Sequence, residues 1–305
     1  MKKVLITGGT GFIGRHCLPL LLAQGYEVHA TYANNYIKDY PEVTWHKVDL
    51  LDTKIASELV KDIQATHLLH FAWYTAHGEF WSSPENHHWM QASYSLIEQF
   101  VLNGGQRVVV AGSCAEYDWK YGICSEQLTP LVPTTLYGSC KHGLQLILNT
   151  LAKKNQTSWA WGRIFYLYGP HENPSKFVPY VIDSMLEGKP VTCKAGSKLT
   201  DYMYVEDVAS AFVALLESDF QGALNIASGT PVYLRDIVEK IAVELGDVNN
   251  INYEEPCFSE DNPAMLIADN HYLKDIVGWE PDYELDAGLK KAIEWQRKNK
   301  ERQHG

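Results

Sequence analysis

The 305-residue sequence lacks an excess of basic charge, a long apolar run and a paired-cysteine motif. Aspartate and glutamate number 37 against 26 lysines and arginines, so the formal net charge is −11. Because proteins that grip a phosphate backbone need a basic stripe, this acidic balance disfavours a nucleic-acid partner. No stretch reaches the roughly 18 uninterrupted apolar residues that a membrane span needs, so we expect no membrane partner either.

The six cysteines show no CxxC pair and no even spacing, a pattern typical of reduced thiols in a cytoplasmic protein. The histidines at 87–88 lack the spacing of metal ligands, so we expect no metal site. The N-terminal MKKVLITGG has only a short apolar run before two glycines, and no cleavage site follows. This start predicts a buried strand rather than a signal peptide.

Short apolar, β-branched runs alternate with longer amphipathic segments through the first half of the chain. The predicted strands are 4–7, 27–32, 43–50, 67–73, 107–113 and 158–165, and the predicted helices are 14–25, 53–64, 84–103 and 135–154. Continuous apolar strands separated by helices indicate a parallel sheet that is covered on both faces. With right-handed crossovers, the pattern predicts an α/β fold with a Rossmann-type doubly wound parallel sheet.

The composition changes after Gly169, where four prolines follow within about twenty residues. We therefore predict a smaller C-terminal α/β lobe that binds the substrate. The expected division assigns 1–168 to the Rossmann domain, with a return segment at about 200–228, and 169–199 and 229–305 to the smaller lobe. Helices are expected at 205–218, 234–245 and 285–300, and a strand at 223–228.

The segment TGGTGFIG, residues 7–14, follows the first predicted strand and opens a predicted helix. Gly8 allows a tight turn, Gly11 lets the backbone approach a pyrophosphate, and Gly14 permits close packing of helix on strand. The helix N-terminus then presents N–H groups to the phosphates. Phe12 and Ile13 belong to the same predicted cofactor site, which is a strong signal because of its place between strand and helix.

The GxxGxxG spacing, together with the YxxxK of LYGSCK at 136–141, resembles the extended short-chain dehydrogenase/reductase superfamily. More narrowly, the chain resembles its nucleotide-sugar epimerase/dehydratase/reductase branch over nearly the whole length, and 177–191 and 200–212 are similar to C-terminal landmarks of that branch. The resemblance implies an NAD(P) cofactor, a nucleotide-sugar substrate and a homodimer joined by the helices near 84–103 and 135–154.

The resemblance also implies further cofactor contacts. Asp49 and Leu50, in VDLLD, are similar to the residues at the adenine edge, where Asp49 would accept the exocyclic amine. Ala72, in HFAW, is similar to the strand-end segment that lines the cofactor.

The end of the second strand bears on the choice of nicotinamide. Tyr32 stands where enzymes that use NAD usually carry an acid for the adenine ribose diol. Because a carboxylate there would repel a 2′-phosphate, its absence favours NADP over NAD. Arg15 and Lys38 are the nearest candidates to hold that phosphate.

Tyr137 and Lys141 are similar to the family's proton-transfer pair. Tyrosine titrates near 10, and a lysine four residues on lies on the same helical face, where its charge favours the tyrosinate. The family's lysine also bonds the nicotinamide ribose, and a Ser or Thr at an upstream strand end bonds the substrate oxygen. Ser113 ends the strand 107–113, 24 positions before Tyr137. We predict that all three residues are catalytic. The alternative is that Tyr137 and Lys141 are ordinary residues on the surface of a helix.

Departures from the family pattern narrow the reaction. Dehydratases of the family usually carry Asp-Glu directly after the catalytic Ser or Thr, where this chain has Cys114 and Ala115, so loss of water is not expected. Cys114 is either a buried filler or an acid–base group. FYLYGPHEN, at 165–173, resembles a segment of the family's 4-keto-6-deoxy-sugar epimerase/reductases and places His171 on their epimerisation histidine. A turn-capping histidine is the alternative.

Other departures concern the substrate. The family's Arg-Asp-Tyr, whose arginine usually grips the diphosphate, appears as Thr200-Asp201-Tyr202, and Lys194 or Lys198 could supply the charge. The aromatic-rich loop 72–81 either stacks on a sugar or closes the pocket. The predicted substrate contacts are Trp73, Ser113, Tyr166, His171 and Phe177.

We predict an NAD(P)-dependent oxidoreductase that reduces a keto group, at C4, of a nucleotide-linked 6-deoxy sugar. A nucleotide-sugar 4-epimerase with bound NAD is the alternative enzyme. A non-catalytic, cofactor-sensing protein on the same fold is a third reading, which the complete Ser-Tyr-Lys set disfavours.

Overall fold

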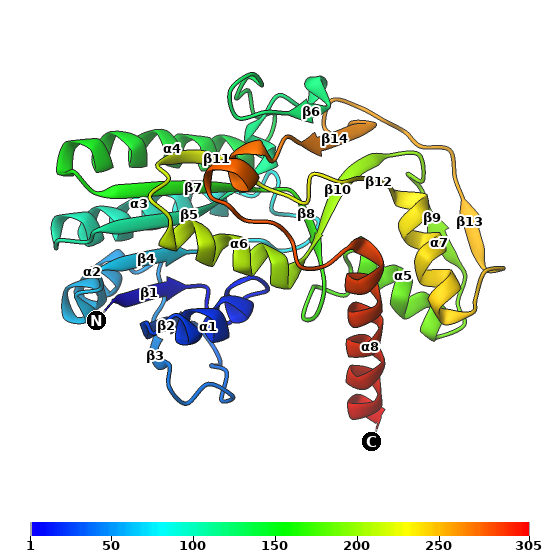
Figure 1. The fold of residues 1–305 in the computed structure, drawn as a ribbon, viewed down its shortest axis with the longest axis horizontal. Coiled ribbons are helices and arrows are strands. Elements are labelled where there is room, and N and C mark those ends of the chain that lie inside the picture. Colours follow the sequence, from blue (N-terminus) through cyan, green and yellow to red (C-terminus); the bar gives the residue numbers. More distant parts are fainter. Residues whose placement is uncertain (1, 305) are drawn as a thin grey trace.

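The computed structural model describes residues 2–304, with side chains through Arg302. Its centre is a seven-stranded sheet in the order β11-β7-β5-β4-β1-β2-β3 (Figure 1). The strands are β1 (Lys3–Thr7), β2 (Glu27–Tyr32), β3 (Thr44–Lys47), β4 (His67–His70), β5 (Arg107–Ser113), β7 (Ser158–Ile164) and β11 (Gly222–Ile226). All neighbouring pairs are parallel, which confirms the predicted Rossmann-type doubly wound sheet.

Helices cover both faces of this sheet (Figure 1). They are α2 (Thr53–Ile63), α3 (Glu85–Leu102) and α4 (Leu136–Asn155) on one face, and α1 (Gly14–Ala23) and α6 (Val205–Glu217) on the other. Alternation along β1 shows the cause: Leu5 packs on the side of α2, α3 and α4, while Val4 and Ile6 pack on the side of α1 and α6. A strand that is buried on both faces is apolar on both, as Val4, Leu5 and Ile6 at the centre of β1 are.

A second, smaller sheet lies beside the first, in the order β12-β10-β14-β6, with β8 paired to β10. A two-stranded β9–β13 pair and three helices complete this part of the molecule. The elements are β6 (Ile123–Cys124), β8 (Tyr166–Tyr168), β9 (Val191–Cys193), β10 (Leu199–Tyr204), β12 (Pro231–Tyr233), β13 (Ile251–Tyr253), β14 (Met265–Ala268), α5 (Phe177–Leu186), α7 (Leu234–Leu245) and α8 (Leu285–His304). A separate apolar core joins α5, α7 and α8.

The smaller sheet contains strands from both sides of the expected domain boundary at residue 168. β6 and β8 come from before that boundary, and β10 and β14 from after it. The division of the chain into 1–168 and later segments stays a prediction, and the chain passes between the two sheets more than once. No helix among residues 2–304 combines the length and the apolar character that crossing a bilayer requires.

A buried ion pair fixes the carboxyl end of β5. Glu116, in the 3-10 turn Cys114–Glu116, and Arg163 of β7 are 0% and 2% exposed, with Oε2 to Nε at 2.9 Å. The other carboxylate oxygen of Glu116 accepts from the backbone N–H of Ser113 and from Trp161 Nε1, both at 2.8 Å. The pair therefore holds the residue that ends β5 against its neighbouring strand.

This arrangement predicts a large loss of stability on breaking the pair. Arg163→Met leaves the Glu116 carboxylate buried without its cation, so the free energy of unfolding should fall by about 3–5 kcal/mol. Urea unfolding measures the loss. Lys120→Met is the matched control, since Lys120 pairs with Glu260 at 3.7 Å in an exposed bridge worth less than about 1 kcal/mol. Similar losses in the two variants would contradict the role given to Arg163.

Candidate active site

The glycine segment forms a tight turn between β1 and α1. Gly8 has φ +70°, and the Gly11 N–H donates to its carbonyl at 2.9 Å. A Cβ on Gly14 would overlap the same carbonyl oxygen, so α1 can start this close to β1 only with glycine there. Half-buried Phe12 and Ile13 lead into the helix, whose N-terminus faces the turn. This cradle fits the phosphates of a dinucleotide.

Arg15 adds positive charge beside the turn. Its Nη2 donates to the Thr10 carbonyl at 3.2 Å, while its Nε is buried without a hydrogen-bond partner among the described residues. Burial lowers the pKa of Arg15, and the Tyr40 hydroxyl raises it in part. A partly desolvated guanidinium with a free donor at the start of α1 suits a phosphate of the same dinucleotide.

The remaining predicted cofactor residues lie along the same edge of the sheet. Ala72 is next to the turn, since its N–H donates to Thr7 Oγ1 at 3.3 Å and a Cβ on Gly8 would lie 3.0 Å from that nitrogen. Tyr32 ends β2 with its ring 6.2 Å from that of Trp45. Asp49 and Leu50 follow β3, Asp49 with an exposed side chain and Leu50 buried.

Ser113, Tyr137 and Lys141 meet at the carboxyl edge of the sheet, and we refer to them as the relay. They are 8%, 9% and 3% exposed. The Ser113 hydroxyl is a neighbour that lowers the pKa of Tyr137, and Lys141 Nζ donates to the Ala111 carbonyl of β5 at 2.9 Å. Tyr137 and Lys141 are both in α4. The Thr135 hydroxyl caps the start of this helix, where it accepts a hydrogen bond from the Gly138 N–H at 3.1 Å. The structure brings the three predicted residues together.

Burial governs the charges of the relay. It raises the pKa of Tyr137, a shift that the neighbouring Ser113 hydroxyl opposes in part. It lowers the pKa of Lys141 to about 7, and the carboxylate of Glu116 opposes that shift. Each group is therefore held toward its neutral form, and a charged tyrosinate would gain most from an ammonium at the same place.

Aromatic side chains enclose Tyr137. Its ring lies 5.0 Å from that of Phe80, 5.8 Å from Trp81 and 6.4 Å from Trp73, all edge to face. The Tyr137 N–H donates to the Trp81 carbonyl at 3.1 Å, and Lys141 Nζ lies 3.8 Å from the centroid of the Trp73 ring. Of these rings the sequence identified only that of Trp73 as a contact, although the aromatic content of 72–81 was a signal for the others.

The smaller sheet contributes a second set of aromatic and charged groups. Tyr166 of β8 stacks on Tyr202 of β10 at 5.2 Å, and Phe177 lies 6.5 Å from Tyr202. Lys198 Nζ lies 5.5 Å from the centroid of the Tyr166 ring. Cys114 is the electrostatic neighbour that Tyr166 and Lys198 share. The β8–β10 pairing thus brings Tyr166, a predicted substrate contact, beside Tyr202 and near Cys114, while Phe177, a second predicted contact, lies near Tyr202.

His171 has a different setting. It has φ +71°, and its ring lies 4.7 Å from that of Trp295 in α8 and 6.2 Å from that of His16 in α1. Burial and then the charges of Arg15 and His16 lower its pKa to about 4, so the imidazole is neutral near pH 7. Arg15 and His16 belong to α1, beside the glycine turn, and Trp295 belongs to α8; no described contact joins His171 to a relay residue.

Glu172 is a candidate that the sequence did not reveal. Its Oε2 is buried without a hydrogen-bond partner among the described residues. Burial raises its pKa to about 8, against the opposing charge of Lys176, whose Nζ lies 5.3 Å from the centroid of the Phe80 ring. An acid after Gly-Pro-His carries no sequence signal of burial, since only tertiary packing desolvates it.

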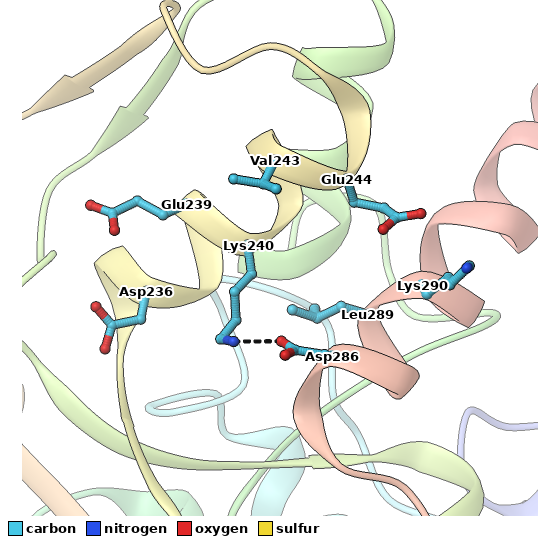
Figure 2. Close-up of a pocket in the computed structure, with 8 residues that line it drawn as sticks. All are labelled: Asp236, Glu239, Lys240, Val243, Glu244, Asp286, Leu289 and Lys290. Atoms are coloured by element: carbon cyan, nitrogen blue, oxygen red, sulfur yellow. Dashed lines mark ion pairs between the residues drawn. The ribbon is translucent and has the colours of Figure 1, made fainter.

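Two grooves lie outside the relay. The larger, of about 520 Å³, runs between α7 and α8 and has a charged rim in which Lys240 pairs with Asp286 (Figure 2). It contains no residue of the relay or of the glycine turn. The smaller, of about 460 Å³, borders Trp119, whose Nε1 donates to the Cys114 carbonyl at 2.8 Å. The convergence of chemical groups, rather than groove size, therefore identifies the candidate active site.

Known proteins show the same organisation. A profile of the NAD dependent epimerase/dehydratase family matches residues 4–227. The chain is 26% identical to a UDP-glucose 4-epimerase of Neisseria meningitidis serogroup C, over 98% of both chains. It is similar in structure to the UDP-glucose 4-epimerase of Thermus thermophilus in complex with NAD, with a TM-score of 0.82, 25% identity, and 97% of this chain and 99% of that one covered. MoeE5 in complex with UDP-glucuronic acid and NAD gives a TM-score of 0.84 and 27% identity at the same coverage.

The buried Lys141 predicts a pH-dependent stability. Its pKa is about 7 in the folded chain against an ordinary 10.5, so between these values the unfolded chain binds one more proton. The cost of burying the ammonium is complete below the folded pKa and is relieved as the pH rises. Relative to Lys141→Met, the free energy of unfolding should therefore rise by about 1.4 kcal/mol per pH unit in this window.

Denaturant titrations of both variants at about pH 7.5 and about pH 9.5 measure this difference. A difference between the variants that does not change with pH would mean that Lys141 keeps its ordinary pKa in the folded chain.

Proposed function

Since this chain belongs to the NAD-dependent epimerase/dehydratase family, we propose that it reduces a keto group, at C4, of a nucleotide-linked 6-deoxy sugar. The observation that carries the proposal is the joint burial of Ser113, Tyr137 and Lys141 at the carboxyl edge of the parallel sheet, next to the glycine turn. Full-length similarity to a UDP-glucose 4-epimerase supports a nucleotide sugar as the substrate.

The nicotinamide cofactor, when bound, supplies the hydride. The Ser113 hydroxyl donates a hydrogen bond to the carbonyl oxygen and fixes its direction. Tyr137 gives its phenolic proton to that oxygen as negative charge develops there. The Lys141 ammonium stabilises the resulting tyrosinate. Phe80, Trp81 and Trp73 keep water from the proton being moved, which strengthens each of these interactions.

Loss of water is not supported by the groups that follow Ser113. Burial raises the pKa of the Cys114 thiol to about 12, so it stays protonated near pH 7. Ala115 has no titratable group, and the Glu116 carboxylate is committed to Arg163, Trp161 and the Ser113 N–H. This removes the acid–base pair that elimination would need.

A nucleotide-sugar 4-epimerase is the second candidate. The names of the relatives favour it. Such an enzyme must present both faces of the keto sugar to one hydride donor, so the sugar has to turn over inside the site. We expect the three aromatic rings packed around Tyr137 to restrict this turning of the sugar, which is why we place reduction first.

An isotope experiment separates these reactions. With deuterated reduced cofactor and a nucleotide 4-keto-6-deoxy sugar, we expect one deuterium at the former carbonyl carbon and one cofactor oxidised per product. Tyr137→Phe, which loses only a hydroxyl, should lower turnover at least ~10²-fold while leaving cofactor affinity nearly unchanged. Mass spectrometry and loss of reduced-cofactor absorbance measure both.

Other outcomes have distinct meanings. Inversion at C4 without net use of cofactor would establish the 4-epimerase instead. Deuterium from heavy water at the carbons beside the ketone would give His171 or Glu172 a working acid–base role. Activity of Tyr137→Phe within a few-fold of the parent would remove the relay from the proposal.

The cofactor preference is the finer part of the proposal. With Tyr32 rather than an acid at the end of β2, and Arg15 holding an unpartnered Nε near the glycine turn, we expect kcat/KM with NADPH to equal or exceed that with NADH. Arg15→Met should lower kcat/KM for NADPH more than for NADH. A tenfold or greater preference for NADH in the parent would show that other groups hold the ribose diol.

The proposal includes a homodimer joined through α3 and α4. Leu146 and Ile147 lie exposed on α4 and would be covered in such a dimer. The molar mass in solution tests this part.

A further inference from the structure

Lys198 is a buried cation on the substrate side of the site. It directly precedes β10, is 8% exposed, and places Nζ 5.5 Å from the centroid of the Tyr166 ring. Its one side-chain hydrogen bond among the described residues goes from Nζ to Asn262 Oδ1, at 3.0 Å. An ammonium has three donors, so this contact leaves most of its hydrogen-bonding capacity unused.

No carboxylate of the described side chains lies within ion-pair distance of Lys198. Burial accordingly lowers its pKa, and the only neighbour that opposes the shift is the Cys114 thiol. Arg163, which is also buried, has Glu116 as its counter-charge. Taking an unpaired charge out of water is costly, and such charges persist where a ligand completes them.

The surroundings argue against a purely structural role. Glu260 and Asp261 stand in the same loop as Asn262, so an acid could have met Lys198 from that side. Instead, Glu260 pairs with the exposed Lys120 at 3.7 Å, and Lys198 receives only a neutral amide oxygen. If Lys198 only held this loop against β10, a carboxylate partner would stabilise that contact more than the amide oxygen does.

We propose that Lys198 binds an oxyanion of the substrate, beside Cys114 and Tyr166. The inference rests on the proposed function and names a residue that determines substrate specificity. The anion is either a phosphate of the nucleotide diphosphate or a carboxylate on the sugar, since an ammonium recognises both. Cys114 directly follows Ser113, so we assign the bound anion to the same molecule whose carbonyl would meet the relay.

Calorimetric titration of the NADP-saturated protein tests the proposal with three probes: UDP, UDP-glucose and UDP-glucuronic acid. Lys198→Met should weaken at least one of them about tenfold or more, as expected for a lost charge-assisted contact. Lys198→Arg should keep the affinity within about threefold. Lys120→Met is the matched control because Lys120 is an exposed lysine on the neighbouring loop, and it should change none of the three.

The pattern of loss identifies the anion. Weaker binding of all three probes supports the diphosphate as the source, and weaker binding of UDP-glucuronic acid alone supports a sugar carboxylate. Unchanged affinities in Lys198→Met for probes that the parent binds would overturn the proposal.

A second measurement does not depend on a nucleotide sugar. Inorganic pyrophosphate should raise the melting temperature of the parent and not that of Lys198→Met, which without the anion should melt at or above the parent. A lower melting temperature of Lys198→Met, with an unchanged response to pyrophosphate, would show a structural lysine and overturn the proposal. If the parent binds pyrophosphate through Lys198 but none of the UDP compounds, the nucleotide-sugar function fails while the anion site stands.

Discussion

The carboxylate of Glu116 is the interaction on which the geometry of the candidate site depends. It joins the last N–H of β5 to Trp161 and Arg163 of β7, all without access to water. The turn that it closes is also the surface on which α4 rests, because a Cβ on Gly138 would overlap the carbonyl oxygen of Ala115. Glycine beside Tyr137 thus lets the helix approach the strand end closely. The distance from Ser113 to Tyr137 follows from these two contacts and needs no direct link between the side chains to maintain it.

The same enclosure explains why so many charged groups here are displaced from their ordinary protonation. Burial lowers the pKa of Lys141 and Lys198 and raises those of Tyr137 and Glu172. Each of these shifts reflects a charged form that burial destabilises in the folded chain, so these four groups are a cost to stability. Structural ion pairs shift pKa values as well, but in such a pair the cation contacts its acid, as Arg163 contacts Glu116. Groups without such partners are typical of a site that binds charge or moves protons.

The sequence predicted the parts of the molecule whose signals are local. β2, β5 and α7 begin and end where their apolar patterns do, and the glycine turn and the relay follow from spacing within about 30 residues. The pairing within the smaller sheet could not be predicted from the sequence. Its strands are only two to six residues long, and they pair with strands far away in the sequence, as β6 does with β14. The stack of Tyr166 on Tyr202, the orphaned oxygen of Glu172 and the unpaired Lys198 all arise from that pairing or from burial that no short pattern encodes. His171 fits the family segment in sequence, yet its positive φ turns it toward Trp295 and away from the relay.

The residues of the candidate site are divided between the two sheets. The groups that we propose for proton transfer lie at the end of β5 and on α4, which packs against the large parallel sheet. The groups that would meet the rest of the substrate lie on and beside the second sheet. β8 and β10 connect the two, since β8 continues almost directly from β7 and carries Tyr166 to Tyr202. A change on the second sheet can therefore alter which molecule is held without moving Ser113, Tyr137 or Lys141. At 26% identity to a UDP-glucose 4-epimerase, shared geometry in the relay is expected even where the substrate differs. The residues that decide between reduction and epimerisation must then be sought among the aromatic and charged groups around the relay, because the proton transfer that we propose for the relay is common to both reactions.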